Sequence, residues 1–415
     1  MISVAQLGVT PLDHEIARLQ DKVRDGHESH VQVVQLGWAF VSKARATGDP
    51  GYYKIAEACA QLAGDVADSL LLRGHVDHAL HRFAHAEAIA RQLTADQRAG
   101  WQSFALLGDA LMEQGKLVEA VAVYQRMIDI RPCLQTYARV AHLRWLKGDL
   151  SGAKELMRLA VESGNSRDPE PAAWAYTRLA LYQLQAGEMT AAGWSADRAF
   201  EFVKDYPAAL FLRSKLEIER GDPAKAAASL RGACAQVPLP EYQWALADAA
   251  RLAGDTDLAA KTEEALNSRG AVEDPRSFAL FLATRRAAPD TACALSHDEL
   301  TNRRDVLTYD AVAWTALTAG KTREAKDNMK LALAEGTIDA RLFYHAAKIE
   351  AASGQQKSAI AWLRRAAAIQ QMLLPSERAD LFGQAAALGV SLPAESMSQA
   401  TKPTLADKAL LKKQL

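Results

Sequence analysis

The chain has 415 residues, of which 49% are hydrophobic and 24% are charged. This composition supplies enough apolar material for a continuous core and excludes a largely disordered chain. The 49 basic and 50 acidic residues leave a formal net charge of -1, so nucleic acid is not expected as a partner, because proteins that bind it usually carry a basic excess. No run of about 18 apolar residues occurs, and membrane insertion is therefore not expected.

The first predicted element is a helix that begins at Thr10-Pro11 and continues through LDHEIARLQDKVR. Proline is favoured in the first turn of a helix, so this segment is expected to cap the N-terminal end of the fold. The N-terminus lacks the charged start and apolar stretch of a signal peptide, which favours a cytoplasmic protein. A periplasmic or secreted protein whose signal peptide had been removed stays open as the alternative.

The clearest structural unit is FALLGDALMEQGKLVEAVAVYQRMIDIRP, from Phe104 to Pro132. Its pattern predicts a helix, a turn at Gly115 and a second helix that ends at Pro132. Gly108 and Ala120 are small where the two helices must touch. Glycine can turn the backbone without a Cβ penalty, and proline lacks the N–H donor that a continuing helix needs.

This unit resembles the tetratricopeptide repeat (TPR) family, whose pattern combines aromatic residues with Leu-Gly, a turn glycine, an alanine and a closing proline. Stepping along the chain by about 34 residues from Ala120 gives a series of alanines in phase. The series is Ala56, Ala86, Ala120, Ala153, Ala192, Ala226, Ala259, Ala292, Ala325 and Ala359. The resemblance and the period together predict an all-α, right-handed α-solenoid of about ten helical hairpins with a cap helix at each end.

The turns support the same register. Seven units have a glycine five residues before the alanine marker, namely Gly115, Gly148, Gly187, Gly221, Gly254, Gly320 and Gly354. His81 takes this place in the second unit. Residues 271–305 contain a shortened pair without a turn glycine, which is interpreted as a degenerate repeat or, alternatively, as a break in the solenoid. The segment SGNSRDPEP, around Asp168 to Pro171, is expected to be a loop between hairpins.

Residues Ser376 to Leu388 are predicted to form the C-terminal cap helix, so that a single TPR solenoid spans residues 10–390. Residues 391–415 are polar and interrupted by proline, and we expect them to form a flexible tail. The four cysteines fall in separate hairpins of this register, too far apart for disulfide bonds, and are expected to be buried thiols: Cys59, Cys133, Cys234 and Cys293.

The sequence contains none of the common catalytic motifs, such as GxSxG, HExxH or a phosphate-binding GxxxxGK[ST] loop. Neither an enzyme nor a bound cofactor is expected. The TPR resemblance implies instead a protein-interaction scaffold, which holds a partner peptide or helix in the concave groove lined by the first helix of each hairpin.

The register projects a set of side chains onto this concave groove. They are His75, His78, Asp109, Met112, His142, Trp145, Trp174, Leu184, Phe211, Lys215, Trp244, Asp248, Arg251, Trp314, Tyr344 and Lys348. Trp145, Trp174, Phe211 and Trp244 come from successive hairpins and would form an apolar strip suited to a protein partner. The alternative for each tryptophan is that it packs between neighbouring hairpins.

The residues of the groove can be compared with two more specific kinds of binding site. One TPR subclass grips a C-terminal carboxylate with lysine and asparagine residues, but the corresponding places here are Ala105, Asp109, Ala138 and His142. A second possibility is a ligand- or metal-binding sensor, or an accessory subunit of an enzyme complex, because His75 and His78 share a helix face near Asp109. The interpretation without a metal is preferred.

Overall fold

The computed structural model describes residues 8, 10–24, 29–96, 99–164 and 169–392. Within these residues the chain forms 22 α-helices and one 3-10 helix, and no strand. The predicted all-α class is therefore confirmed. The flexible tail predicted for residues 391–415 lies outside the described residues from position 393 onwards.

The helices pack as ten antiparallel hairpins between two single helices. The hairpins are α2 (His30–Thr47) with α3 (Gly51–Ala63), α4 (Ala67–Ala79) with α5 (Phe83–Thr94), α6 (Trp101–Glu113) with α7 (Leu117–Ile130), α8 (Leu134–Leu146) with α9 (Leu150–Glu162), α10 (Pro169–Gln185) with α11 (Met189–Phe202), α12 (Pro207–Glu219) with α13 (Pro223–Gln236), α14 (Pro240–Leu252) with α15 (Thr256–Glu273), α16 (Pro275–Arg285) with α17 (Pro289–Asn302), α18 (Val306–Thr318) with α19 (Thr322–Ala332), and α20 (Ala340–Ala352) with α21 (Gln356–Ala367). The remaining elements are α1 (Pro11–Arg24), η1 (Gln370–Met372) and α22 (Pro375–Ala387).

The alanine series marks the contact between the two helices of every hairpin. Each of the ten marker alanines lies on the second helix and is at most 1% exposed. A larger side chain at these places would hold the helices apart, because small residues set how closely two helices can approach. The predicted repeat register is thus confirmed over ten hairpins.

Both predicted cap helices are present. At the start of α1, the Asp13 carboxylate accepts hydrogen bonds from the backbone N–H and the hydroxyl of Thr10, and it pairs with Lys43 at 2.6 Å. These bonds hold the pKa of Asp13 down at about 2. The ion pair ties α1 to α2, because Lys43 lies on α2. At the other end, α22 covers the region predicted for the C-terminal cap.

The eighth hairpin, α16 with α17, continues the stack rather than breaking it, since its helices contact α14, α15 and α18. Its turn contains Arg286 and Ala288, both with positive φ, in place of a glycine. His81 likewise has a φ of 58° in the second hairpin. One detail of the predicted loops is wrong: Pro169 to Pro171 form the first turn of α10, because proline suits the start of a helix. Residues 165–168 lie outside the described residues.

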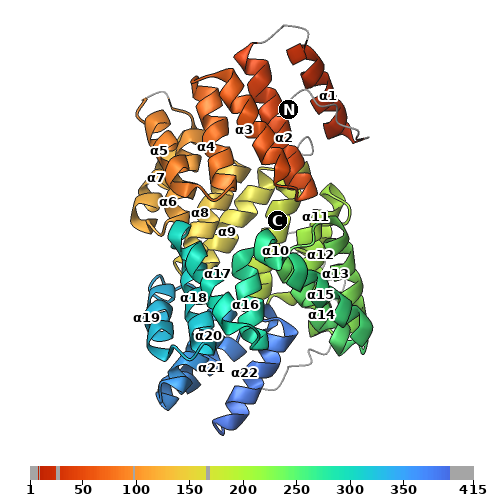
Figure 1. Ribbon diagram of the computed structural model, residues 1–415, viewed down its shortest axis with the longest axis vertical. Helices are drawn as coiled ribbons and strands as arrows, with labels where there is room; N and C mark the ends of the chain where they lie inside the picture. Colours follow the sequence, from red (N-terminus) through yellow and green to blue (C-terminus); the bar gives the residue numbers. More distant parts are fainter. Residues whose placement is uncertain (1–7, 9, 25–28, 97–98, 165–168, 393–415) are drawn as a thin grey trace, which may run out of the picture.

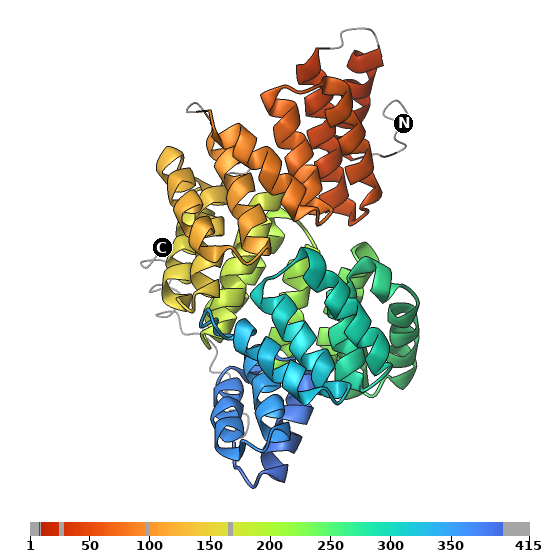
Figure 2. The ribbon, with the colours of Figure 1, turned by 60° about the vertical axis from the view of Figure 1, so that its left-hand side comes forward.

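The stack of hairpins coils back upon itself, so that helices far apart in the sequence lie side by side. Figure 1 shows α17 and α18 beside the hairpins of α6 to α9, and an ion pair between Arg303 and Glu113 joins the two regions. Figure 2 shows the same stack from the red N-terminal hairpins at the top to the blue C-terminal hairpins at the bottom. The Arg304 N–H donates to the Glu113 carbonyl at 3.0 Å, and the Thr337 hydroxyl donates to the Leu146 carbonyl. In each contact the tight turn of an early hairpin meets the connection between two late hairpins.

This inter-turn contact distinguishes two of the turn glycines from the others. An ideal Cβ on Gly148 would lie 2.5 Å from the carbonyl oxygen of Gly336, and a Cβ on Gly115 would collide with the carbonyl of Arg304. No atom lies within 4 Å of an ideal Cβ on Gly187, Gly221 or Gly254. Two glycines are therefore needed both for their φ and for close approach of the backbone.

We expect Gly148→Ala to destabilise the protein more than Gly254→Ala. Both residues have a left-handed backbone, with φ of 77° and 81°, so each alanine costs about 1–2 kcal/mol in backbone strain. Only Gly148→Ala adds a collision with Gly336, which should cost roughly a further 1–3 kcal/mol. Urea denaturation followed by circular dichroism measures the difference. Equal losses for the two variants would show that these turns are not pressed together in solution.

Candidate partner-binding surface

Much of the predicted groove is covered by the chain itself. Trp244 is 1% exposed, Trp314 is 3% exposed and Tyr344 is fully buried. The Trp244 indole donates to the Ser376 hydroxyl at 3.1 Å, and the Tyr344 hydroxyl donates to Asp380 at 2.5 Å, both on the cap helix α22. The expectation that these side chains line an open groove is corrected. The cap helix α22 lies on Trp244 and Tyr344, and Trp314 packs between the neighbouring hairpins on Thr284 and His345, so none of the three is open to a partner in this conformation.

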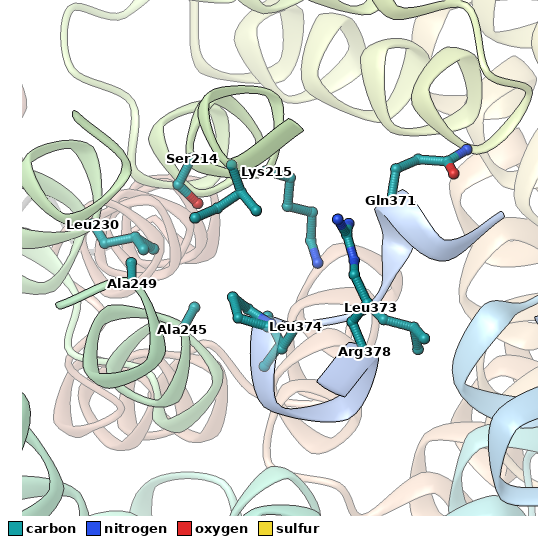
Figure 3. Close-up of a pocket in the computed structure, with 11 residues that line it drawn as sticks. Ser214, Lys215, Leu230, Ala245, Ala249, Gln371, Leu373, Leu374 and Arg378 are labelled. Atoms are coloured by element: carbon teal, nitrogen blue, oxygen red, sulfur yellow. The ribbon is translucent and has the colours of Figure 1, made fainter. Parts of the chain in front are cut away.

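The cap segment also covers the inner face of α12. Lys215 is 9% exposed and donates a hydrogen bond to the Met372 carbonyl at 2.9 Å. Figure 3 shows Lys215 extending from α12 toward the segment that carries Leu373 and Arg378. Burial lowers the pKa of Lys215 to about 8. The pocket left here has a volume of about 10 Å³, room for roughly one water molecule.

The other end of the predicted groove is a polar wall, where the Asp109 carboxylate is already bonded to side chains of the protein itself. Both oxygens of Asp109 accept from Arg139 Nε at 2.9 Å, and one also accepts from the Tyr124 hydroxyl at 2.6 Å. His75 stacks on Trp38 with ring centres 5.0 Å apart. Burial lowers the pKa of His75 to about 3, and nearby positive charges add to this effect. Asp109 is thus part of a half-buried ion pair and not an open ligand.

The remaining projected residues have mixed environments. Met112 and Phe211 are half-buried, and Phe211 stacks on Tyr242 at 4.9 Å. His78 contacts the ring of Phe83, and Arg251 is exposed and paired with Glu263. Three further side chains have internal partners or no exposure: Leu184 is buried, Asp248 is paired with Arg285, and Lys348 is paired with Asp380.

One part of the predicted groove stays open, on the inner faces of α8 and α10. Trp174 is 37% exposed, whereas Trp145 next to it is 8% exposed and donates its indole N–H to Gln185 at 2.8 Å. His142 stacks on Trp145 with ring centres 5.5 Å apart. Burial lowers the pKa of His142 to about 3, and the charge of Arg178 adds to this effect, so the imidazole is neutral at pH 7.

Arg178 completes this open surface. Its guanidinium carbon lies 5.9 Å from the centre of the Trp174 ring and 5.4 Å from that of Tyr182. One guanidinium nitrogen lies 3.2 Å from His142 Nδ1. We define the open surface as Trp174, Arg178 and His142; the Tyr182 ring on which Arg178 packs is fully buried.

Two residues of the inner wall, Arg139 and Arg178, were missed by the sequence projection. Arg178 was within reach of it, because it lies four residues after Trp174 and positions i and i+4 share a helix face. Arg139 lies three residues before His142, which also places it on the same face. The projection by register left both arginines out, and nothing in the sequence showed which arginines would find carboxylates.

The family model for the tetratricopeptide repeat matches residues 71–132 and 211–271. These two stretches contain the helices α5 to α7 and α13 to α14. The marker alanines Ala86, Ala120 and Ala226 lie on these helices. The chain contains tetratricopeptide repeats.

Three solved structures match much of the chain at low identity and low TM-score. The APC/C hetero-tetramer Cut9–Hcn1 matches at 13% identity and a TM-score of 0.38, over 90% of each chain. Yeast Tom70 matches at 15% identity and a TM-score of 0.39, over 96% of this chain and 95% of that chain. A tetratricopeptide repeat protein from Parabacteroides merdae matches at 18% identity and a TM-score of 0.33, over 60% of this chain and 98% of that chain. At such TM-scores these likenesses say nothing about partners.

The comparison with curated proteins finds no match to this chain. In the part of the chain that the structure describes, no helix has the length and apolar character to cross a bilayer. Across those same residues, no three His, Cys, Asp or Glu side chains are grouped so as to hold a metal ion. All four cysteines are free thiols, with Cys59 and Cys293 buried and Cys133 and Cys234 half-buried.

Proposed function

We propose that this protein is a non-catalytic scaffold that holds a segment of a partner protein against the open surface of α8 and α10. The observation that carries the proposal is the exposure of Trp174 on an inner helix of the stack. A tryptophan buries a large area when it is covered, and such residues are enriched among the anchors of protein interfaces. TPR proteins generally bind other proteins, which supports the same class of function.

The extent of the surface limits what can bind. The chain's own cap segment covers the inner faces of α12 and α14, as the bonds of Lys215 and Trp244 show. A partner segment therefore has access to the inner wall beside Trp174 and not to the whole length of the stack. A short peptide or the end of a helix fits this restriction better than a long continuous helix.

A library of 12-residue peptides displayed on phage tests this proposal with the full chain as bait. Peptides that bind should lose about 30-fold in affinity on Trp174→Ala, because a hot-spot side chain contributes on the order of 2 kcal/mol. Trp194→Ala is the matched control, since Trp194 lies on the second helix of the same hairpin and packs against Tyr176 instead. Peptides that bind Trp174→Ala as tightly as the wild type would overturn the proposal.

A further inference from the structure

The buried and half-buried arginines in the described part of the chain are paired with carboxylates, with one exception. Among the described residues, ten arginines are buried or half-buried, and nine of these have a carboxylate within 4.0 Å. The nine are Arg82, Arg139, Arg198, Arg213, Arg276, Arg285, Arg303, Arg341 and Arg378. The tenth is Arg178, whose polar contacts are the His142 ring nitrogen and, at 3.5 Å, the Tyr182 hydroxyl.

The guanidinium of Arg178 is left with unused donors. It carries five N–H groups in a planar fork, and its buried Nε has no hydrogen-bond partner among the described residues. A buried donor without a partner costs free energy, and a partly buried cation costs more unless an anion approaches it. The guanidinium lies beside the rings of Trp174 and Tyr182.

We propose that Arg178 is the centre of a carboxylate-binding site, in which Trp174 packs against the apolar neighbour of an acidic residue in the partner segment. This inference deepens the proposed function and rests on it for the carrier of the carboxylate. A planar carboxylate matches the guanidinium fork with two parallel hydrogen bonds. The nearest acidic side chains of the wall do not supply it, because Asp109 is bound to Arg139 and Asp305 to Arg276.

The surroundings favour a peptide carboxylate over a nucleic-acid phosphate. A nucleic-acid backbone presents phosphates in series and requires several cations along its path, whereas the other inner arginines are neutralised by their own partners. His142 adds no charge near neutral pH, because its pKa lies at about 3. The site therefore offers one cation beside one exposed aromatic ring, which suits a single Asp or Glu next to an apolar residue.

The test uses the full chain labelled with 5-fluorotryptophan and read by ¹⁹F NMR, with the Trp174 resonance assigned from Trp174→Phe. The probes are the acetylated, amidated dipeptide Leu-Glu, its Leu-Gln twin and inorganic phosphate. We expect Leu-Glu to shift the Trp174 resonance in a saturable way and to bind about tenfold more tightly than Leu-Gln. Arg178→Gln should remove this preference, and Arg178→Lys should retain part of it.

Arg198→Gln is the matched control, since Arg198 also lies over aromatic rings, at 5.8 Å from Trp194, but on the second helix of the hairpin. It should leave the preference for Leu-Glu unchanged. The inference is overturned if Leu-Glu gives no saturable shift, if its preference survives Arg178→Gln, or if phosphate binds as tightly. If the protein prefers Leu-Glu over Leu-Gln but no library peptide needs Trp174 for binding, only the proposed function is overturned. If library peptides need Trp174 for binding but bind equally well when their Glu is replaced by Gln, only the carboxylate site is overturned.

Discussion

Replacing Trp244 by alanine is expected to lower the free energy of unfolding by about 3–5 kcal/mol. The indole is 1% exposed, meets Phe281 edge-on at 5.8 Å and bonds to Ser376 on the cap helix. Its removal leaves a cavity at the place where α14, α16 and α22 meet, and it also removes one of the bonds that hold the cap segment in the groove. Urea denaturation followed by circular dichroism measures the loss.

Trp174→Ala supplies the comparison, because Trp174 was projected onto the same strip as Trp244. Its side chain is 37% exposed, so we expect its replacement to cost below about 1 kcal/mol in stability while weakening peptide binding. The two tryptophans thus separate a structural role from a binding role. Similar losses of stability in both variants would contradict the burial seen here.

Replacing Arg341 by alanine is expected to cost about 3–5 kcal/mol in stability, because it leaves a buried carboxylate without its cation. Arg341 pairs with Glu377 at 2.5 Å and with Glu241 at 3.2 Å, and the Glu377 side chain is fully buried. The pair joins α20 to α22 and reaches α14. Arg144→Ala is the control: its pair with Asp149 has half-exposed side chains, and such pairs contribute about 0–1 kcal/mol. Equal midpoints of urea denaturation for the two variants would contradict the role assigned to Glu377.

The same ion pair predicts a loss of stability in acid. Burial by itself raises the pKa of Glu377, but the charge and hydrogen bonds of Arg341 outweigh it, so that the pKa lies below the ordinary value of 4.5. A carboxylate whose folded pKa is lowered stabilises the protein above its unfolded pKa, and this contribution is lost as the pH falls toward the folded value. Wild-type stability should therefore decline below about pH 4.5, and Glu377→Gln should decline less over that range. Parallel pH profiles for the two proteins would contradict this assignment.

Local sequence patterns were sufficient to predict the repeat. The small residue at Ala120 and its counterparts, and the glycine at Gly115 and its counterparts, act between helices that are neighbours in the chain. Such contacts repeat with the period of the sequence, because each hairpin of a solenoid packs mainly on the next. The number of hairpins, the two cap helices and the unusual turn at His81 could therefore be predicted without any structure.

Which part of the inner wall is open depends on how the whole stack coils. Small rotations between successive hairpins add up along the stack until Gly148 meets Gly336 and Trp244 meets Ser376, and no local pattern encodes that sum. Trp174 stays exposed, whereas Trp314 is covered by neighbouring hairpins, through Thr284 of α16 and His345 of α20. Whether an arginine finds a carboxylate also depends on side chains from distant helices, and for this reason Arg178 could be recognised as unpaired only after the whole stack was seen.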